Sequence, residues 1–291
     1  MTSHKLVQQQ FGPAARDYAD CEVHRSGASL KRLVELVEPR AGWRVLDVAT
    51  GAGHTAAIFA PHVAEVVASD VTPEMLRQTE ALAREKGLNN IRTAYADAGS
   101  LDFEAQTFDL VTCRLAAHHF PDIARFAGQA RRVLKPGGRL AIVDNVTPDA
   151  ELPGGLPESE LAAAGVAYNA FEKLRDPSHA RALAAEEWIR ILRDAGFVVS
   201  RREQTEKEMA FKPWVDRMRC DVDTAKRLEK MLRGTSTLSA FLRPREIDGV
   251  LHFTLQEFIV VADRVDRGYA GAPDSKVFTI SPMKAPRRLT D

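Results

Sequence analysis

Two carboxylates and a glycine turn near the start of the chain have the residue types and spacing of a ligand site. Asp47 stands in the apolar run that begins the stretch VLDVATGAGHTAA (45–57), and Gly51 and Gly53 follow it. Asp70 ends the next apolar run, 19 residues after Gly51. A glycine turn lets a ligand approach the backbone closely, and a carboxylate in the place of Asp70 can accept hydrogen bonds from both ribose hydroxyls. These residues predict a nucleoside-binding site.

The charge of Asp47 separates two classes of nucleoside ligand. The stretch 51–56 also fits the loose dinucleotide pattern G-x-G-x-x-A. A pyrophosphate beside Asp47, however, would meet a like charge, which costs about a few kcal/mol in a partly buried site. A ligand with an ammonium group would be attracted instead. The stretch therefore favours a cationic amino-acid nucleoside such as S-adenosylmethionine over a nicotinamide dinucleotide.

A pair of histidines could supply acid–base chemistry. His118 and His119 stand in the segment AAHHFPD (116–122), shortly after Arg114. Histidine has a pKa suited to removing a proton near neutral pH, so one of the two is the candidate base. The alternative is that both pack against or cap the helix that begins near Pro121. No metal site is expected, and the three widely spaced cysteines indicate neither structural zinc nor a disulfide framework.

Alternating strand and helix patterns must position these residues. Buried strand-like runs are separated by helical patterns, and this repeated order is typical of a parallel sheet with helices on both faces. The prediction is an α/β fold with a doubly wound, mostly parallel, seven-stranded sheet of the Rossmann-like type. The first five strands are expected at residues 44–49, 63–70, 91–97, 108–114 and 139–145.

The regular alternation stops after Asn145. Two helical patterns (158–174 and 185–195), a strand around 197–211, a helix at 215–232 and a last strand at 251–265 follow. We expect a helical insertion after strand five and an antiparallel last strand. The predicted organisation is an N-terminal lid segment (1–30), a core (31–147), an insertion or acceptor cap with the final strands (148–266), and a loosely ordered tail (267–291).

An ordered series of motifs between about residues 25 and 145 resembles the class I S-adenosylmethionine-dependent methyltransferases. DVATGAG (47–53) is similar to motif I of that family, with Ala49 in place of the first glycine. The segments SDVTPEML, YADA, FDLVTCR and VLKPGGRL follow in order. The sequences of these motifs are most similar to those of the methyltransferase-11 type, which is related to the ubiquinone and menaquinone biosynthesis methyltransferases. The resemblance implies methyl transfer from S-adenosylmethionine.

The resemblance also implies a role for each donor-binding position. Asp70 would hold the ribose hydroxyls, and Asp97 would accept the exocyclic amine of adenine. Met75 and Leu76 would sandwich the adenine ring, although both fit helix core equally well. Arg114 would lie near the methionine end unless it is a solvated loop residue. The complete implied set is Asp47, Ala49, Gly51, Gly53, Asp70, Val71, Met75, Asp97, Ala98 and Arg114.

The acceptor pocket must come from the remaining segments. The N-terminal QQQFGPAARDYAD resembles a segment that covers the cofactor in relatives, which would make Phe11 and Tyr18 lid contacts. Two apolar stripes at helical spacing could roof a cleft for a planar acceptor such as a phenol or quinol, or could simply pack on the sheet. The stripes are Ala167, Tyr168, Phe171 and Leu174, and then Phe211, Trp214 and Met218.

Composition excludes several classes of protein. The 40 basic residues balance the 40 acidic residues, so a nucleic-acid partner is not expected. No apolar run reaches the roughly 18 residues of a membrane span, and MTSHKLVQQQ lacks the apolar region of a secretory signal. We expect a cytoplasmic methyltransferase with a small-molecule acceptor, compatible with a homodimer. A nicotinamide-dependent oxidoreductase and a non-catalytic S-adenosylmethionine-binding module remain alternatives.

Overall fold

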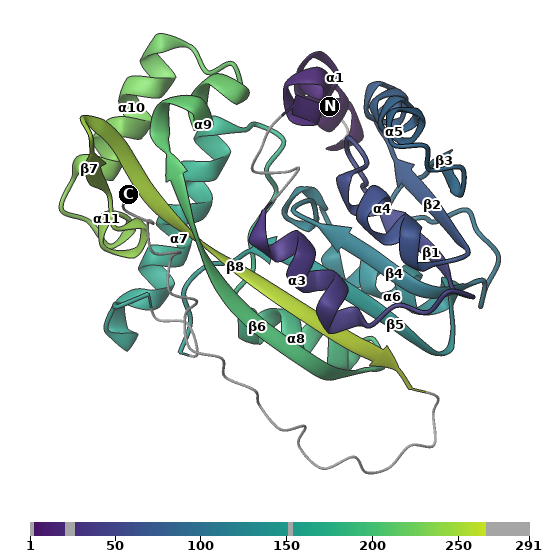
Figure 1. The fold of residues 1–291 in the computed structure, drawn as a ribbon. Helices are drawn as coiled ribbons and strands as arrows, with labels where there is room; N and C mark the ends of the chain where they lie inside the picture. Colours follow the sequence, from purple (N-terminus) through teal and green to yellow (C-terminus); the bar gives the residue numbers. More distant parts are fainter. Residues whose placement is uncertain (1–2, 21–26, 151–153, 266–291) are drawn as a thin grey trace, which may run out of the picture.

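The computed structural model describes residues 3–20, 27–150 and 154–265 of the chain. An eight-stranded sheet runs through them (Figure 1) in the order β3-β2-β1-β4-β5-β8-β6, with β7 paired to β8. The strands are β1 (Arg44–Val48), β2 (Glu65–Asp70), β3 (Ile91–Tyr95), β4 (Phe108–Arg114), β5 (Leu134–Asn145), β6 (Phe197–Ala210), β7 (Arg245–Ile247) and β8 (Val250–Arg264).

The directions of the strands confirm the predicted fold class. Strands β1 to β5 pair in parallel, whereas β8 runs antiparallel to both of its neighbours, β5 and β6. The seven-stranded path with an antiparallel last strand is therefore as predicted. The three-residue β7, which forms a tight hairpin with β8, is an addition that the sequence analysis missed. The predicted tail (267–291) lies outside the described residues.

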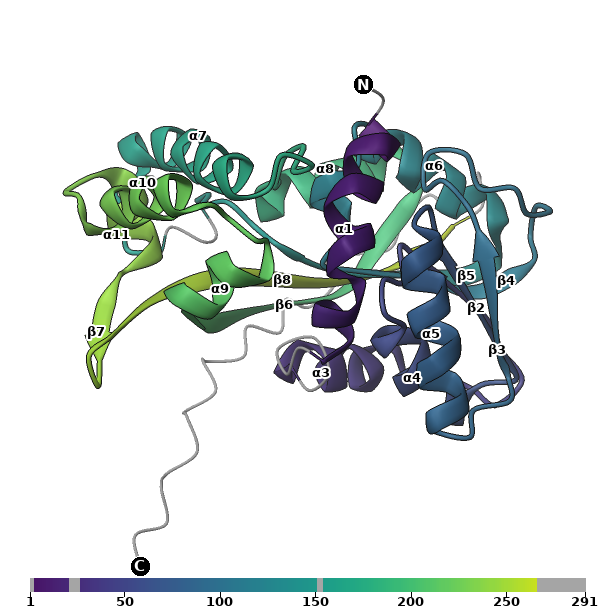
Figure 2. The ribbon, with the colours of Figure 1, turned by 90° about the horizontal axis from the view of Figure 1, so that it is seen from above.

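Helices cover both faces of the sheet because successive strand residues point to opposite sides. Val45 packs in the core under α3 (Ala28–Val37) and α4 (His54–Phe59), and its neighbour Leu46 packs in the core under α6 (Ile123–Val133) and α8 (Ala185–Asp194). Figure 2 shows these two layers on either side of the sheet, with α5 (Pro73–Glu85) beside α4. The helix α1 (Ser3–Asp20) lies across one end of the sheet, between α5 and α9 (Phe211–Arg217).

A second apolar core forms where β6 and β8 extend beyond the parallel strands. The helices around it are α7 (Glu158–Arg175), α9, α10 (Val222–Arg233) and α11 (Thr237–Leu242). The rings of Phe171 and Trp214 stack at its centre, 5.0 Å apart and 12° from parallel. Both side chains are at most 2% exposed, as is Tyr168. Six of the seven stripe residues belong to this core. Their burial favours the interpretation that the stripes pack over the interpretation that they roof an acceptor cleft.

Local signals explain where several elements begin. The N-cap residue Asp122 accepts a hydrogen bond from the backbone of Arg125, which starts α6. The side chain of Asp221 likewise accepts a hydrogen bond from the backbone amide of Thr224, which starts α10. The helix predicted at 215–232 is therefore two helices, because Asp221 begins a new one after α9 has ended.

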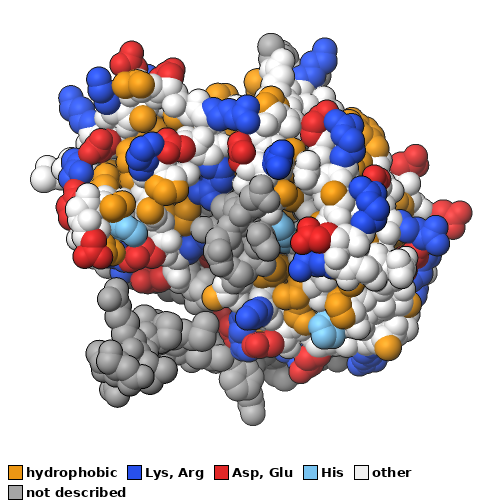
Figure 3. Space-filling view, turned by 45° about the horizontal axis from the view of Figure 1, so that its top comes forward, with side chains coloured by type: hydrophobic (Ala, Val, Ile, Leu, Met, Phe, Trp, Pro, Cys, Tyr) orange, Lys and Arg blue, Asp and Glu red, His pale blue; other side chains and the backbone are white. Residues whose placement is uncertain are grey.

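None of the helices in the described ranges is long and apolar enough to cross a bilayer. On the face drawn in Figure 3, lysine and arginine side chains are interspersed with aspartate and glutamate. This mixture agrees with the equal numbers of acidic and basic residues in the chain.

Candidate active site

A cavity of about 370 Å³ opens at the ends of β1, β2 and β4, beneath α1. Small-molecule sites commonly have this size. Eight of the ten predicted donor-binding residues line it: Ala49, Gly51, Asp70, Val71, Met75, Asp97, Ala98 and Arg114. Asp47 and Gly53 do not. Since the eight come from four separate stretches of sequence, the fold has gathered them onto one surface.

The turn after β1 has the backbone conformation that its glycines make available. Gly51 and Gly53 adopt positive φ angles of 58° and 87°, which glycine accommodates without strain. A Cβ on Gly53 would also stand 2.8 Å from the Thr79 side chain, so this position supports the packing of the turn on α5. Ala49 has a φ of 53°, at the position where the resembling family carries glycine. An alanine there costs about 1 to 2 kcal/mol of backbone strain.

Asp70 is positioned on the cavity wall by two backbone groups. The Thr72 amide donates to one carboxylate oxygen at 2.8 Å, and the Gly51 amide donates to the other at 3.0 Å. Burial raises the pKa of Asp70, and these hydrogen bonds act in the opposite direction. Each carboxylate oxygen can accept a further hydrogen bond. The arrangement can therefore hold a pair of vicinal hydroxyls.

Asp47 lies beneath the turn instead of on the cavity wall, which corrects the direct ligand contact that we predicted. It is 1% exposed, and its two oxygens accept hydrogen bonds from the hydroxyls of Thr50 (2.6 Å) and Thr112 (2.7 Å). Burial raises its pKa to about 6, although both hydroxyls and the nearby Arg114 lower it. Asp47 therefore ties the turn to β4.

The predicted adenine end of the cavity contains Met75, Asp97 and Ala98. Met75 is only 3% exposed and lines the cavity, so its roles as core residue and as ligand wall are compatible. One oxygen of Asp97 accepts from the Gly99 amide at 2.9 Å. The same oxygen lies 3.1 Å from Nε2 of His4 on α1, which places the lid helix directly over this end.

Arg114 is the last residue of β4 and is 8% exposed, so it is not the solvated loop arginine of the alternative interpretation. Burial lowers its pKa, and the charges of Glu257 and Asp47 raise it. Its place on the cavity wall, at the opposite side of the glycine turn from Asp97, suits the polar end of an amino-acid ligand.

The two candidate histidines have different surroundings. His118 turns away from the cavity wall: its Nδ1 lies 2.6 Å from Asp144, and its backbone amide donates to the same carboxylate at 2.9 Å. Burial lowers the pKa of His118, but the charge of Asp144, the hydrogen bond to Asp144 and the charges of Glu172 and Asp176 together raise it above its ordinary value. His119 lines the cavity, and burial together with the charge of His118 lowers its pKa to about 4. His119 is therefore neutral at pH 7 and is the candidate base of the pair.

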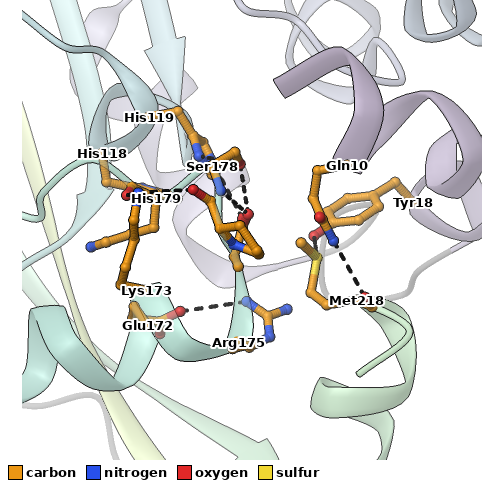
Figure 4. Close-up of polar contacts among 12 residues, drawn as sticks. Gln10, Tyr18, His118, His119, Glu172, Lys173, Arg175, Ser178, His179 and Met218 are labelled. Carbon is orange, nitrogen blue, oxygen red and sulfur yellow. Dashed lines mark hydrogen bonds and ion pairs between the residues drawn. The ribbon is translucent and has the colours of Figure 1, made fainter. Parts of the chain in front are cut away.

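The sequence analysis missed the polar segment that follows α7. Asp176, Ser178 and His179 are each at most 5% exposed and lie against the histidine pair. Figure 4 shows Ser178 and His179 beside His118 and His119. The signal in the sequence was an acid, a serine and a histidine within the four residues DPSH, which begin where α7 ends. Within the described part of the chain, no group of three potential metal ligands is arranged to hold an ion.

The lid residues Phe11 and Tyr18 both line the cavity. The Phe11 ring stands edge-on to the His119 ring, with their centroids 5.0 Å apart. Gln8 donates to the Val71 carbonyl at 2.6 Å, and the Tyr18 hydroxyl contacts the Met218 sulfur at 3.0 Å. The helix α1 is therefore bonded to the core on one side and to α9 on the other.

Several known proteins are similar to this chain in sequence. A family model described as "Methyltransferase domain" matches residues 46–142. The uncharacterized methyltransferase YcgJ of Bacillus subtilis is 39% identical over 61% of this chain and 66% of its own length. The demethylmenaquinone methyltransferase of Thermus thermophilus is 38% identical over 40% of this chain and 56% of its own length. The alignments thus span about two thirds or less of these two relatives.

Solved structures extend the match beyond the core. The crystal structure of BH2331 from Bacillus halodurans C-125, which is described as a methyltransferase, superposes on this chain with a TM-score of 0.74. The two sequences are 34% identical, and the match covers 82% of this chain and all of the other. The structure of YcgJ itself gives a TM-score of 0.73 and 29% identity, over 82% of this chain and 98% of the other. The similarity therefore includes most of the insertion as well as the parallel strands.

Proposed function

Since this chain belongs to the S-adenosylmethionine-dependent methyltransferases, we propose that it transfers the methyl group of S-adenosylmethionine to a small, apolar or aromatic acceptor. The observation that carries the proposal is the Asp70 carboxylate, which two backbone amides aim into the cavity beside a glycine turn. In this proposal residues 31–147 bind the donor, α1 closes over it, and residues 148–266 form the cap.

The proposed donor orientation follows the order of the lining residues. Adenine lies at Met75, Asp97 and Ala98, and the ribose lies at Asp70 with Val71 beside it. The methionine portion passes the turn at Ala49 and Gly51 toward Arg114. Asp47 and Gly53 act indirectly, because they shape the turn from below. This orientation directs the methyl group toward α1 and the histidines.

The walls around the methyl position suit a planar, apolar acceptor. Phe11, Tyr18, Leu115, His119 and Phe120 face the cavity there. Aromatic walls with one or two polar atoms are typical of small-molecule sites. One relative, from Thermus thermophilus, is named as a demethylmenaquinone methyltransferase. This name agrees with a phenol-like or quinol-like acceptor.

The chain's residues have two tasks in the transfer. The cavity aligns the acceptor atom with the methyl group and excludes water, which supplies most of the rate enhancement in such an in-line displacement. His119 accepts the acceptor's proton as the new bond to the methyl carbon forms, and the carbon–sulfur bonding pair leaves with S-adenosylhomocysteine. His118, whose Nδ1 is paired with the Asp144 carboxylate, stays in place.

A turnover assay with methyl-labelled donor tests the proposal. Wild-type protein should transfer label to at least one member of a panel of phenols, catechols and hydroquinones. His119→Gln should lower turnover by about 10² or more, because it removes the general base. His62→Gln, at an exposed position far from the cavity, is the control and should retain full activity. Bound donor without transfer to any acceptor would indicate a binding module instead.

A further inference from the structure

We propose that Asp176 and Ser178 are positioning residues that fix the tautomer of His119, with the proton on Nδ1 and the lone pair on Nε2. Both residues belong to the segment between α7 and α8, which is part of the cap. The inference rests on the proposed function, in which His119 removes the acceptor's proton.

The hydroxyl of Ser178 has only one hydrogen, and its direction determines the tautomer. Ser178 Oγ lies 2.6 Å from an oxygen of Asp176, which also accepts from the Ser178 amide at 2.8 Å. A carboxylate can only accept, so the hydroxyl donates to Asp176. Ser178 Oγ then has only lone pairs to offer His119 Nδ1, which lies 3.1 Å away. Nδ1 must therefore carry the hydrogen of this contact. Figure 4 shows Ser178 and His119 side by side.

The other ring nitrogen is left to accept a proton. His119 Nε2 lies 3.9 Å from the second oxygen of Asp176, too far for a hydrogen bond. When Nε2 gains a proton, the same carboxylate faces the new imidazolium and stabilises it. A buried aspartate holds and stabilises a catalytic histidine in the same manner in the serine proteases, although there the contact is direct.

Burial and the neighbouring His118 keep His119 neutral until it accepts a proton. His118, paired with Asp144, lies with its ring 4.3 Å from that of His119 and opposes a second positive charge. Three further groups face the pair: Glu172 and Arg175 from α7, and the neutral His179. Burial and the His118 charge lower the pKa of His119 to about 4, although the Asp176 charge, a hydrogen bond to the Ser178 backbone and the Asp144 charge raise it. Asp176 thus stabilises the protonated His119 ring only during turnover, when Nε2 carries the acceptor's proton.

The segment is held firmly enough to act as a fixed support. Lys173 donates to the carbonyls of Pro177 (2.8 Å) and His179 (2.6 Å). The amides of Ala180 and Arg181 donate to the His118 carbonyl at 2.8 and 3.0 Å. The segment is therefore fastened both to α7 and to the turn that carries the histidines.

The proton balance closes without an additional reagent. The acceptor's O–H or N–H bond breaks as Nε2 takes the proton, and the freed electron pair forms the bond to the methyl carbon. The carbon–sulfur pair remains on S-adenosylhomocysteine. Nε2 then loses its proton to water when the products leave, which restores the Nδ1–H tautomer.

Long-range proton–nitrogen NMR spectra of protein labelled with ¹⁵N-histidine test the inference without an acceptor. The His119 signals are assigned by their loss in His119→Gln. Wild-type protein should show His119 protonated on Nδ1. Ser178→Ala should shift it to the Nε2–H form, because the hydroxyl acceptor for Nδ1–H is lost and Nε2–H can then face Asp176.

Two further variants sharpen the test. Ser178→Thr keeps the hydroxyl and should keep the wild-type tautomer. Asp176→Ala frees the serine hydrogen to donate to Nδ1, so it should shift the tautomer as Ser178→Ala does; if it does not fold, Ser178→Ala and Ser178→Thr carry the test. An Nε2–H tautomer in the wild type, or no change in Ser178→Ala, would overturn the inference. Calorimetry with S-adenosylmethionine on the same samples reports the proposed function separately, since these variants should bind the donor normally.

Discussion

Asp47 and Asp70 are residues of one type whose surroundings give them different tasks. Backbone amides aim the Asp70 carboxylate into the cavity, whereas two threonine hydroxyls enclose that of Asp47. Burial without a directly paired cation raises the pKa of Asp47 to about 6. Its stability effect should therefore depend on pH.

The stability of the wild type relative to Asp47→Asn should rise as the pH falls from 7 to 4. Because the folded-state pKa lies above the ordinary value, the folded protein retains a proton that the unfolded chain loses between about pH 4 and pH 6. The gain should be on the order of 2 to 3 kcal/mol and complete below about pH 4. Urea unfolding of both proteins at several pH values measures it. Asp102→Asn, at an exposed position, controls for net charge, and a pH-independent difference for Asp47→Asn would refute the account.

At the scale of elements, α7 shows why one apolar pattern has two interpretations. A stripe at helical spacing indicates only which face is buried, and the partner of that face comes from the fold. Here the partner is the extended β6–β8 pair with α9, so Phe171 and Trp214 stabilise the insertion and do not line the cavity at the ends of β1, β2 and β4.

Phe171→Ala should lower the free energy of unfolding by about 3 to 5 kcal/mol, because it leaves a cavity in the second core. Its donor affinity should stay close to that of the wild type, since Phe171 does not line the donor cavity. Val166 lies on the same helix and is 73% exposed, so Val166→Ala should change stability little. Chemical unfolding and calorimetry measure both properties. A stable Phe171→Ala protein with altered acceptor preference would restore the roof interpretation.

Local signals explain how far the sequence predicts this molecule. The strands, turns and helices through β5 are determined by patterns among neighbouring residues. The core and eight residues of the cavity wall could therefore be predicted from the sequence. The contact between Ser178 and His119 joins residues 59 positions apart and exists only in the folded protein. The burial of Asp47 likewise depends on Thr112, 65 residues away. Such pairings have no local pattern.

In the proposed function, the described residues of the molecule form a donor-binding sheet with two covers. The helix α1 bonds to the core through Gln8 and to α9 through Gln10, which donates to the Met218 carbonyl at 3.3 Å. The cap approaches from the side of α7, where the buried histidine cluster meets the end of β5. The cavity that they enclose is lined on its inner wall by Asp70.

Calorimetric titration with S-adenosylmethionine tests the central claim most directly. The wild type should bind S-adenosylmethionine and S-adenosylhomocysteine, and should not bind nicotinamide dinucleotides. Asp70→Ala should weaken binding by about 1 to 3 kcal/mol, or about 5- to 150-fold, through the loss of hydrogen bonds to a charged group. Asp102→Ala should bind as the wild type does. Tight binding of a nicotinamide dinucleotide, or undiminished S-adenosylmethionine binding by Asp70→Ala, would contradict the account.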